Sequence, residues 1–281
     1  MRDIDLRQVK ELVKKAFIEA NYHLNHDVRD ALDKACLSES NPKGKEVLQI
    51  LTENYKIADE GNFPLCQDTG VAVIFCEIGQ DIHFTNGDLN ETLNNAVAEA
   101  YDSGFLRKSI VESPLYQRIN TRNNTPAIIH YEIKSGDCLN ITVMPKGGGS
   151  ENMSCLAMLK PSDGEEGLIN LVVNHIRQIK GNPCPPIIVG IGIGGNFETS
   201  ALLAKKSLIT EIDSVNPDPI LAELEQKLMN LINETGIGPM GLGGNTTCLK
   251  VSILTKPCHI ASLPVAINIE CHAHRFKKIS F

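Results

Sequence analysis

The sequence lacks any long apolar run. No stretch approaches the roughly 20 consecutive apolar residues that a membrane-spanning helix needs. Residues 1–17, MRDIDLRQVKELVKKAF, have the charge pattern of an amphipathic helix and lack the apolar core of a signal peptide. We therefore expect a cytoplasmic protein rather than a membrane-bound or secreted one.

The chain also lacks an excess of positive charge, since 34 acidic residues outnumber 27 basic ones. The net charge is -7 and the isoelectric point is near 5.6, so no broad basic face is expected to bind phosphate backbones or anionic lipid. Nucleic acid and membrane surfaces are therefore not the expected partners. A local basic pocket for an anionic metabolite remains compatible with this charge.

The cysteines show neither a regular framework nor a CxxC pair. Their number, nine, is odd, which argues against a disulfide scaffold, and the missing CxxC pair removes local support for a zinc ribbon or a two-cysteine redox motif. The nine positions are 36, 66, 76, 138, 155, 184, 248, 258 and 271. If a metal is bound, its ligands must converge from distant parts of the chain.

What the chain does have is the composition of an ordinary globular protein. Its 281 residues are 42% hydrophobic, enough to bury a large core, and we find no internal repeat, low-complexity tract or clear linker. We therefore treat residues 1–281 as one folded subunit. Apolar residues at three- and four-residue steps predict a helical cap over about residues 1–60.

Helical and strand-like segments alternate along the rest of the chain, which predicts a mixed α/β fold. Residues 127–133 and 138–145 flank KSGD as a predicted hairpin. The other expected strands are 71–79, 185–195, the run from 245 to 254, and the apolar run before ECHAHR; the other expected helices are 88–103, 163–180, 196–208 and 219–235.

Four loops rich in glycine or cysteine stand at the predicted strand ends, where α/β proteins usually build their sites. They are PLCQDTG, PKGGGSENMS, NPCPPIIVGIGIGG and PCHIASLPVAINIECHAHR. Within the third, Gly190, Gly192 and Gly195 match the G-x-G-x-x-G spacing of dinucleotide-binding loops. No clear βαβ unit surrounds them, and Glu198 comes too soon for the usual acidic residue, so nucleotide binding is the weaker hypothesis.

The motifs carry a specific resemblance. CQDTG (66–70), KGGGSEN (146–152), PCPP with GIGG (183–195), GLGGNTT (241–247) and HIASLPVAINIECHAHR (259–275) occur in this order over nearly the whole chain. Together they closely resemble the α subunit, or N-terminal part, of class I fumarate hydratases and the related L-tartrate dehydratases. These are oxygen-sensitive iron–sulfur hydro-lyases.

The resemblance implies a [4Fe–4S] cluster held by Cys66, Cys184 and Cys271. Three thiolates leave one iron without a protein ligand, and such an iron can act as a Lewis acid instead of passing electrons. The other six cysteines are expected to be buried or incidental thiols.

The resemblance also implies roles for other residues. Asp68 and His259 are the expected acid–base pair, since an aspartate can orient a histidine and stabilise its charged form. Arg107, the amide of Gln67 and the backbone of Gly149 are expected to bind the carboxylates of a small dicarboxylate substrate.

Single-chain members of this family continue into a second domain, whereas this sequence ends at Phe281. We therefore expect a separate β subunit that carries the rest of the active site, in an α2β2 assembly or an α-subunit dimer. Between fumarate and L-tartrate, whose hydroxy-acid forms differ by one hydroxyl at C3, we favour fumarate. A non-catalytic cluster-binding scaffold is the alternative from another class; it needs the cysteines but not Gln67, Asp68, Arg107 or His259.

Overall fold

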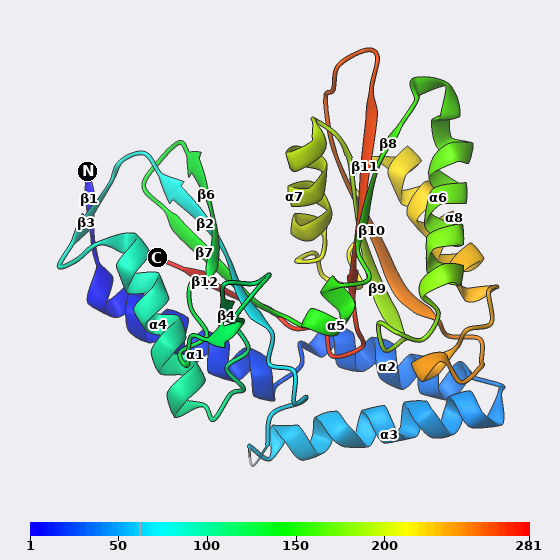
Figure 1. Ribbon diagram of the computed structural model, residues 1–281, viewed down its shortest axis with the longest axis horizontal. Helices are drawn as coiled ribbons and strands as arrows, with labels where there is room; N and C mark the ends of the chain where they lie inside the picture. The colour runs from blue at the N-terminus through cyan, green and yellow to red at the C-terminus, as the bar shows by residue number, and fades with distance from the viewer. Residues whose placement is uncertain (62) are drawn as a thin grey trace. The chain divides into compact units, whose positions relative to one another are not determined.

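The computed structural model describes residues 1–61 and 63–281, and it divides into two compact units. Unit 1 comprises residues 1–25, 55–148 and 275–281, and unit 2 comprises residues 26–54 and 149–274. Each unit contains a four-stranded sheet with helices packed on it, so the predicted mixed α/β class is confirmed (Figure 1). Within the described residues, no helix is both long and apolar enough to cross a membrane.

The main sheet of unit 1 has the strand order β12–β7–β2–β6. Strand β2 (Val71–Gly79) pairs antiparallel with β7 (Leu139–Lys146) and parallel with β6 (Ile128–Lys134). Strand β12 (Lys277–Ser280) pairs antiparallel with β7 and forms one edge. The continuous apolar sequence of β2 follows from its central place, where the side chains of Ala72 to Cys76 are all buried.

The predicted hairpin is wrong in its pairing, although both of its strands exist. β6 and β7 are consecutive along the chain, but β2 lies between them in the sheet. The turn after β6 instead contacts the end of β2: the Gly79 N–H donates to the Cys138 carbonyl at 2.9 Å, and the Asp81 N–H donates to Gly136 at 3.0 Å. Long-range pairing with β2 therefore replaces the local pairing that the sequence predicts.

Helices α1 (Leu6–Tyr22) and α4 (Leu89–Ser103) supply the apolar residues that complete the core of unit 1. Asp5 caps α1 and Asp88 caps α4, each accepting a backbone N–H of the first turn, as expected for N-cap residues. Gly104 follows the last turn of α4, where the sequence predicts its end. A short parallel pair joins β1 (Arg2–Asp5) to β3 (Ile82–Thr85).

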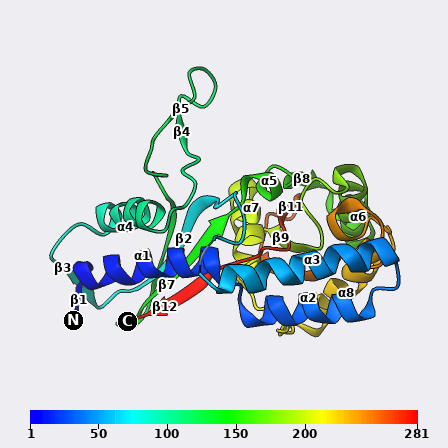
Figure 2. The ribbon, with the colours of Figure 1, turned by 90° about the horizontal axis from the view of Figure 1, so that it is seen from below.

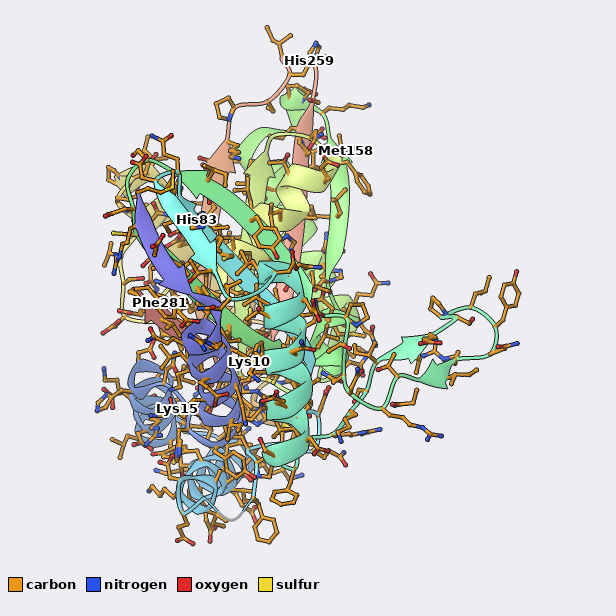
Figure 3. All side chains as sticks on the ribbon, turned by 90° about the vertical axis from the view of Figure 1, so that its left-hand side faces the viewer. Lys10, Lys15, His83, Met158, His259 and Phe281 are labelled. Atoms are coloured by element: carbon orange, nitrogen blue, oxygen red, sulfur yellow. The ribbon has the colours of Figure 1, made fainter. Side chains whose placement is uncertain are left out.

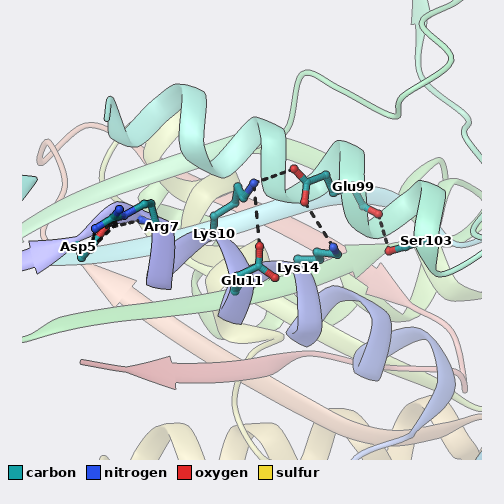
Figure 4. Close-up of polar contacts among 7 residues, drawn as sticks. All are labelled: Asp5, Arg7, Lys10, Glu11, Lys14, Glu99 and Ser103. Atoms are coloured by element: carbon teal, nitrogen blue, oxygen red, sulfur yellow. Dashed lines mark hydrogen bonds and ion pairs between the residues drawn. The ribbon is translucent and has the colours of Figure 1, made fainter. Parts of the chain in front are cut away.

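Charged residues link α1 and α4 at their surface (Figure 4). Glu99 of α4 accepts hydrogen bonds from Lys10 at 2.8 Å and from Lys14 at 3.4 Å. The hydrogen bond from Lys10 is the main cause that lowers the pKa of Glu99. All three side chains are partly exposed, so we expect these ion pairs to orient the helices more than to stabilise them.

The sheet of unit 2 has the order β10–β9–β11–β8. β10 and β9 are parallel, and β11 is antiparallel to both β9 and β8. Helix α7 lies on one face and helices α6 and α8 cover the other (Figure 1). The bounds are β8 (Cys155–Leu159), α6 (Gly164–Ile179), β9 (Ile187–Gly194), α7 (Phe197–Ser207), α8 (Pro219–Asn233), β10 (Cys248–Lys256) and β11 (Leu263–Glu270).

The glycines of GIGIGG let α7 approach β9 closely. A Cβ on Gly190 would lie 2.2 Å from the Ala204 carbonyl oxygen, and a Cβ on Gly192 would lie 2.1 Å from that of Ser200. Both distances are too short for any side chain, so both positions require glycine. Helix packing thus accounts for two of the three glycines whose spacing also matches a dinucleotide loop.

The predicted helical cap is present as three helices, α1, α2 (His26–Ser38) and α3 (Pro42–Asp59). The unit boundaries divide them: α1 belongs to unit 1, whereas α2 and most of α3 belong to unit 2. Between α2 and α3, the buried carboxylate of Glu39 accepts N–H groups of Asn245 and Thr246 at 2.8 to 3.0 Å. Glu39 thereby holds the GLGGNTT loop inside unit 2.

Candidate functional site

The CQDTG loop enters β2 of unit 1, and backbone N–H groups orient the carboxylate of Asp68. Asp68 Oδ1 accepts the Gly70 N–H at 3.1 Å, and Oδ2 accepts the Gly148 N–H at 2.8 Å. The Asp68 N–H in turn points at the sulfur of Cys66, 3.4 Å away. The loop therefore holds its carboxylate in place and directs an N–H toward its thiol.

Three side chains that we did not predict from the sequence donate hydrogen bonds to the backbone carbonyls of this loop. The buried Tyr101 hydroxyl donates to the carbonyls of Thr69 at 2.6 Å and Gly70 at 3.0 Å. Burial raises the pKa of Tyr101 above its usual range, so the hydroxyl remains a donor. The Asn124 amide donates to the Gly70 carbonyl at 3.1 Å, and Arg275 Nη2 donates to that of Asp68 at 2.6 Å.

Arg275 is only 3% exposed, and its Nε and Nη1 have no hydrogen-bond partner among the described residues. It is the arginine of the ECHAHR motif, so the sequence did offer a signal for it. Tyr101 gave no comparable signal because it lies in the apolar stripe of α4. The buried guanidinium of Arg275, in contact with the loop backbone, adds positive charge to this part of unit 1.

Arg107 and Gln67 lie at the same loop. Thr69 Oγ1 donates to the Arg107 carbonyl at 2.8 Å, which fixes the backbone of Arg107 beside the motif. The side chains of Arg107 and Gln67 are both exposed. Unit 1 thus brings together Cys66, Gln67, Asp68 and Arg107.

Unit 2 brings Cys184 and the segment after Cys271 into contact. His272 Nδ1 lies 3.0 Å from the Cys184 carbonyl oxygen, and because a carbonyl only accepts, this nitrogen carries the proton. Cys184 has a φ of 59°, an uncommon left-handed conformation for a residue other than glycine. The PCPP segment therefore holds its thiol in a defined, non-extended turn.

Gly149 belongs to the same group of residues in unit 2. It lies in the short helix α5 (Gly148–Glu151), and the next residue, Ser150, donates its hydroxyl to Glu270 Oε1 at 3.2 Å. The Cys271 N–H donates to the same oxygen at 3.3 Å. Gly149 is exposed, and a Cβ there would meet no atom within 4 Å, so there is space beside this residue.

His259 lies apart from these residues of unit 2. It is in the exposed β10–β11 loop, whereas Cys271 follows the other end of β11. The eight residues of β11 span about 23 Å at 3.3 Å per residue, which separates the two positions. Figure 3 shows His259 at the tip of its loop, beyond the strand that carries Met158.

His259 also lines a cavity of about 450 Å³ in unit 2. Its walls are mainly apolar and include Leu168, Ile193 and Leu263, while Glu165 contributes a carboxylate. None of the other predicted site residues lines this cavity. An apolar cavity with a carboxylate does not suit a dianionic substrate, so we do not place a dicarboxylate in it.

The cysteines fall into two groups by burial. Burial raises the pKa of Cys76 and Cys248 to about 12 and that of Cys155 to about 11, which keeps these thiols protonated. Cys66, Cys184 and Cys271 are all partly exposed and lie in loops. Accessible thiols are the ligands that an iron–sulfur cluster requires, so each of the three residues is chemically suited to bind one, and Cys66 also has the Asp68 N–H directed at its sulfur.

Within the described residues, no three side chains of Cys, His, Asp or Glu gather closely enough to hold a single metal ion. Cluster ligands bind different irons and therefore do not need to converge on one point. The absence of such a group among the described residues therefore bears on sites for a single metal ion and not on a cluster.

Comparison with known proteins gives one consistent result. The sequence profile of the fumarate hydratase (Fumerase) family matches residues 10–280. A protein of Methanocaldococcus jannaschii, provisionally named L(+)-tartrate dehydratase subunit alpha, is 43% identical over 273 residues, covering 95% of each chain. The L(+)-tartrate dehydratase subunit alpha of Escherichia coli K12 is 33% identical over 274 residues, covering 96% of this chain and 89% of its own.

We predict that Gly70→Ala destabilises the loop far more than Gly61→Ala. Both glycines have a φ of +79°, but a Cβ on Gly70 would lie 2.7 Å from the Lys146 backbone, whereas one on Gly61 would meet nothing within 4 Å. Gly61→Ala should cost about 1 kcal/mol from backbone strain alone, and Gly70→Ala at least about 2 kcal/mol more. Urea unfolding of both variants measures the difference; equal losses would contradict the close approach of β7.

Proposed function

The chain belongs to the fumarate hydratase family, and from that premise we propose that it is the α subunit of an iron–sulfur hydro-lyase that dehydrates L-tartrate. The observation that supports this substrate is the name shared by relatives at 43% and 33% identity that cover at least 95% of the chain. These relatives favour L-tartrate as the substrate. From the sequence alone we favoured fumarate. Both substrates require loss or addition of water beside a carboxylate.

We further propose that Cys66, Cys184 and Cys271 hold a [4Fe–4S] cluster. The support is their motifs, their partial exposure and the N–H directed at Cys66. When bound, a cluster with three protein ligands supplies one open iron that acts as a Lewis acid on a hydroxyl and a carboxylate. The protein's own residues then bind the rest of the substrate and move protons.

Binding of the two substrate carboxylates falls to Arg107, Gln67 and Gly149 in this proposal. An exposed guanidinium can bind a carboxylate through two parallel N–H donors, and the amide of Gln67 and the backbone N–H of Gly149 add single donors. The Thr69 hydroxyl fixes the backbone of Arg107, so this cation starts from a defined position. The remaining contacts, including the C3 base, belong to a β subunit.

Asp68 and His259 form the proposed acid–base pair. If Cys66 and Cys271 bind one cluster, Asp68 lies close to Cys271 because it follows Cys66 by two residues. His259 of the same chain is separated from Cys271 by the length of β11. We therefore propose that Asp68 pairs with His259 of a second copy of this chain, so that a dimer of α subunits completes each site.

The proposed function is tested by an anaerobic assay of the chain reconstituted with its β subunit. We expect formation of oxaloacetate from L-tartrate, with kcat/KM at least about tenfold above that for hydration of fumarate. Fumarate hydration without tartrate dehydration would reverse the assignment of substrate. An intact cluster without either activity would favour the cluster-binding scaffold.

We predict that Cys66→Ser, Cys184→Ser and Cys271→Ser each abolish stable cluster binding, because the cluster needs all three thiolates. Cys76→Ser and Cys155→Ser are the matched controls and should keep normal iron and sulfide content, since they lose only packing. Iron and sulfide analysis with Mössbauer spectroscopy measures the outcome. A normal cluster in any of the first three variants would show that the ligand set is wrong.

We predict that Asp68→Asn and His259→Asn keep the cluster but each lose roughly 10² in turnover, the usual scale for removing a positioned acid–base group. Because the pair is proposed to form between chains, mixed dimers of the two variants should regain activity at one of their two sites. Co-expression with two different tags isolates the mixed dimer for assay. A mixed dimer as inactive as the parents would place both groups within one chain, and unchanged turnover in both variants would remove the pair from the mechanism.

A further inference from the structure

An extended arm, residues 107–124, rises from unit 1 and carries its own short hairpin. β4 (Val111–Glu112) pairs antiparallel with β5 (Ile119–Asn120) in a ladder of two residue pairs. Figures 2 and 3 show the arm standing away from α4 and the rest of unit 1. An isolated hairpin this short is marginally stable in water.

The arm nevertheless has a defined shape held at several points. Asn120 Nδ2 donates to the Lys108 carbonyl at 2.8 Å, and the Thr121 N–H donates to that of Ile110 at 2.9 Å. At the tip, Arg118 Nη1 donates to the Pro114 carbonyl at 2.6 Å. Four residues other than glycine have a positive φ between 46° and 65°: Ser113, Arg118, Arg122 and Asn124. Such conformations persist where surrounding contacts stabilise them, yet residues 112–120 are all exposed.

The surface of the arm differs from that of the rest of the chain. At the tip, Leu115 is 77% exposed and Tyr116 is 83% exposed. The arm has four cationic side chains and one anionic side chain, so its net charge is +3, and the rest of the chain therefore carries -10. A basic arm with an apolar tip is complementary to a partner of net negative charge, and the rest of this chain is itself net acidic.

The arm is rooted on the CQDTG motif. At its start, the Arg107 carbonyl accepts the Thr69 hydroxyl. At its end, the buried Asn124 amide donates to the Gly70 carbonyl while its Oδ1 accepts the Ser109 N–H at 2.7 Å. Any protein that contributes a residue to the Asp68 site must therefore approach beside the base of the arm.

We infer that the arm is a docking element that grips a second copy of this chain, with Leu115 and Tyr116 as its apolar anchors. The choice of a second copy as the binding partner rests on the proposed function, in which His259 of that copy reaches Asp68. Charge complementarity between the arm and the acidic remainder of the second copy favours the same occupant.

The test measures self-association of the full, cluster-loaded chain by sedimentation. Leu115→Ser combined with Tyr116→Ser should raise the dimer dissociation constant about 100-fold, since truncation of each anchor costs about tenfold or more. Leu37→Ser combined with Val215→Ser is the matched control, because these two residues are 81% and 79% exposed outside the arm. The control should leave the dissociation constant unchanged, and added salt should weaken the wild-type dimer.

Two results would overturn the inference: a wild-type chain that is monomeric at about 100 µM, or an arm variant that dimerises like the wild type, including one that dimerises normally but no longer binds the β subunit. The last result would assign the arm to the β subunit. Measuring iron and sulfide content distinguishes failure of this inference from failure of the proposed function. A monomeric variant with a normal cluster supports the inference, whereas an arm-dependent dimer without any cluster in the wild type would refute the proposed function alone.

Discussion

The candidate site of unit 1 depends on the hydrogen bonds that the Tyr101 hydroxyl donates to the CQDTG loop. A buried hydroxyl that donates to two adjacent carbonyls, with Asn124 and Arg275 on the same backbone, leaves the CQDTG loop little freedom to change conformation. The side chains of this loop are positioned as well. The Asp68 carboxylate accepts two backbone N–H groups, and a third N–H points at the sulfur of Cys66. The loop is preorganised by α4, which itself contributes no residue to the proposed chemistry.

The two units carry different parts of the proposed chemistry. Unit 1 provides one thiol, a carboxylate and an exposed arginine, and unit 2 provides two thiols and an exposed glycine. Two of the motifs, KGGGSEN and ECHAHR, contain the points where the chain passes between units, after Gly148 and after His274. His259 differs from the rest because a full strand separates it from Cys271, and this separation makes a second copy part of the proposed site.

Local features of the fold could be predicted from the sequence, and long-range ones could not. The apolar run of β2 and the capped helix α4 are visible in the sequence because burial and capping act on neighbouring residues. The insertion of β2 between β6 and β7 was not predictable, since nothing in the hairpin sequence shows a third strand. The contact of Arg275 with Asp68 joins residues 207 positions apart, so the motif revealed the arginine but not its partner. The motifs predicted the candidate residues, and only the structure showed that β11 separates His259 from Cys271.

The order in which the chain is synthesised gives the interleaved units a further consequence. Strand β12 forms an edge of the unit 1 sheet, and Arg275 supports the CQDTG loop, yet both are translated after every residue of unit 2. The edge of β7 in unit 1 therefore stays open until all of unit 2 has been synthesised. The nascent chain must keep that edge from pairing elsewhere, and Cys66, the first of the three proposed cluster ligands, is synthesised long before Arg275 can support its loop.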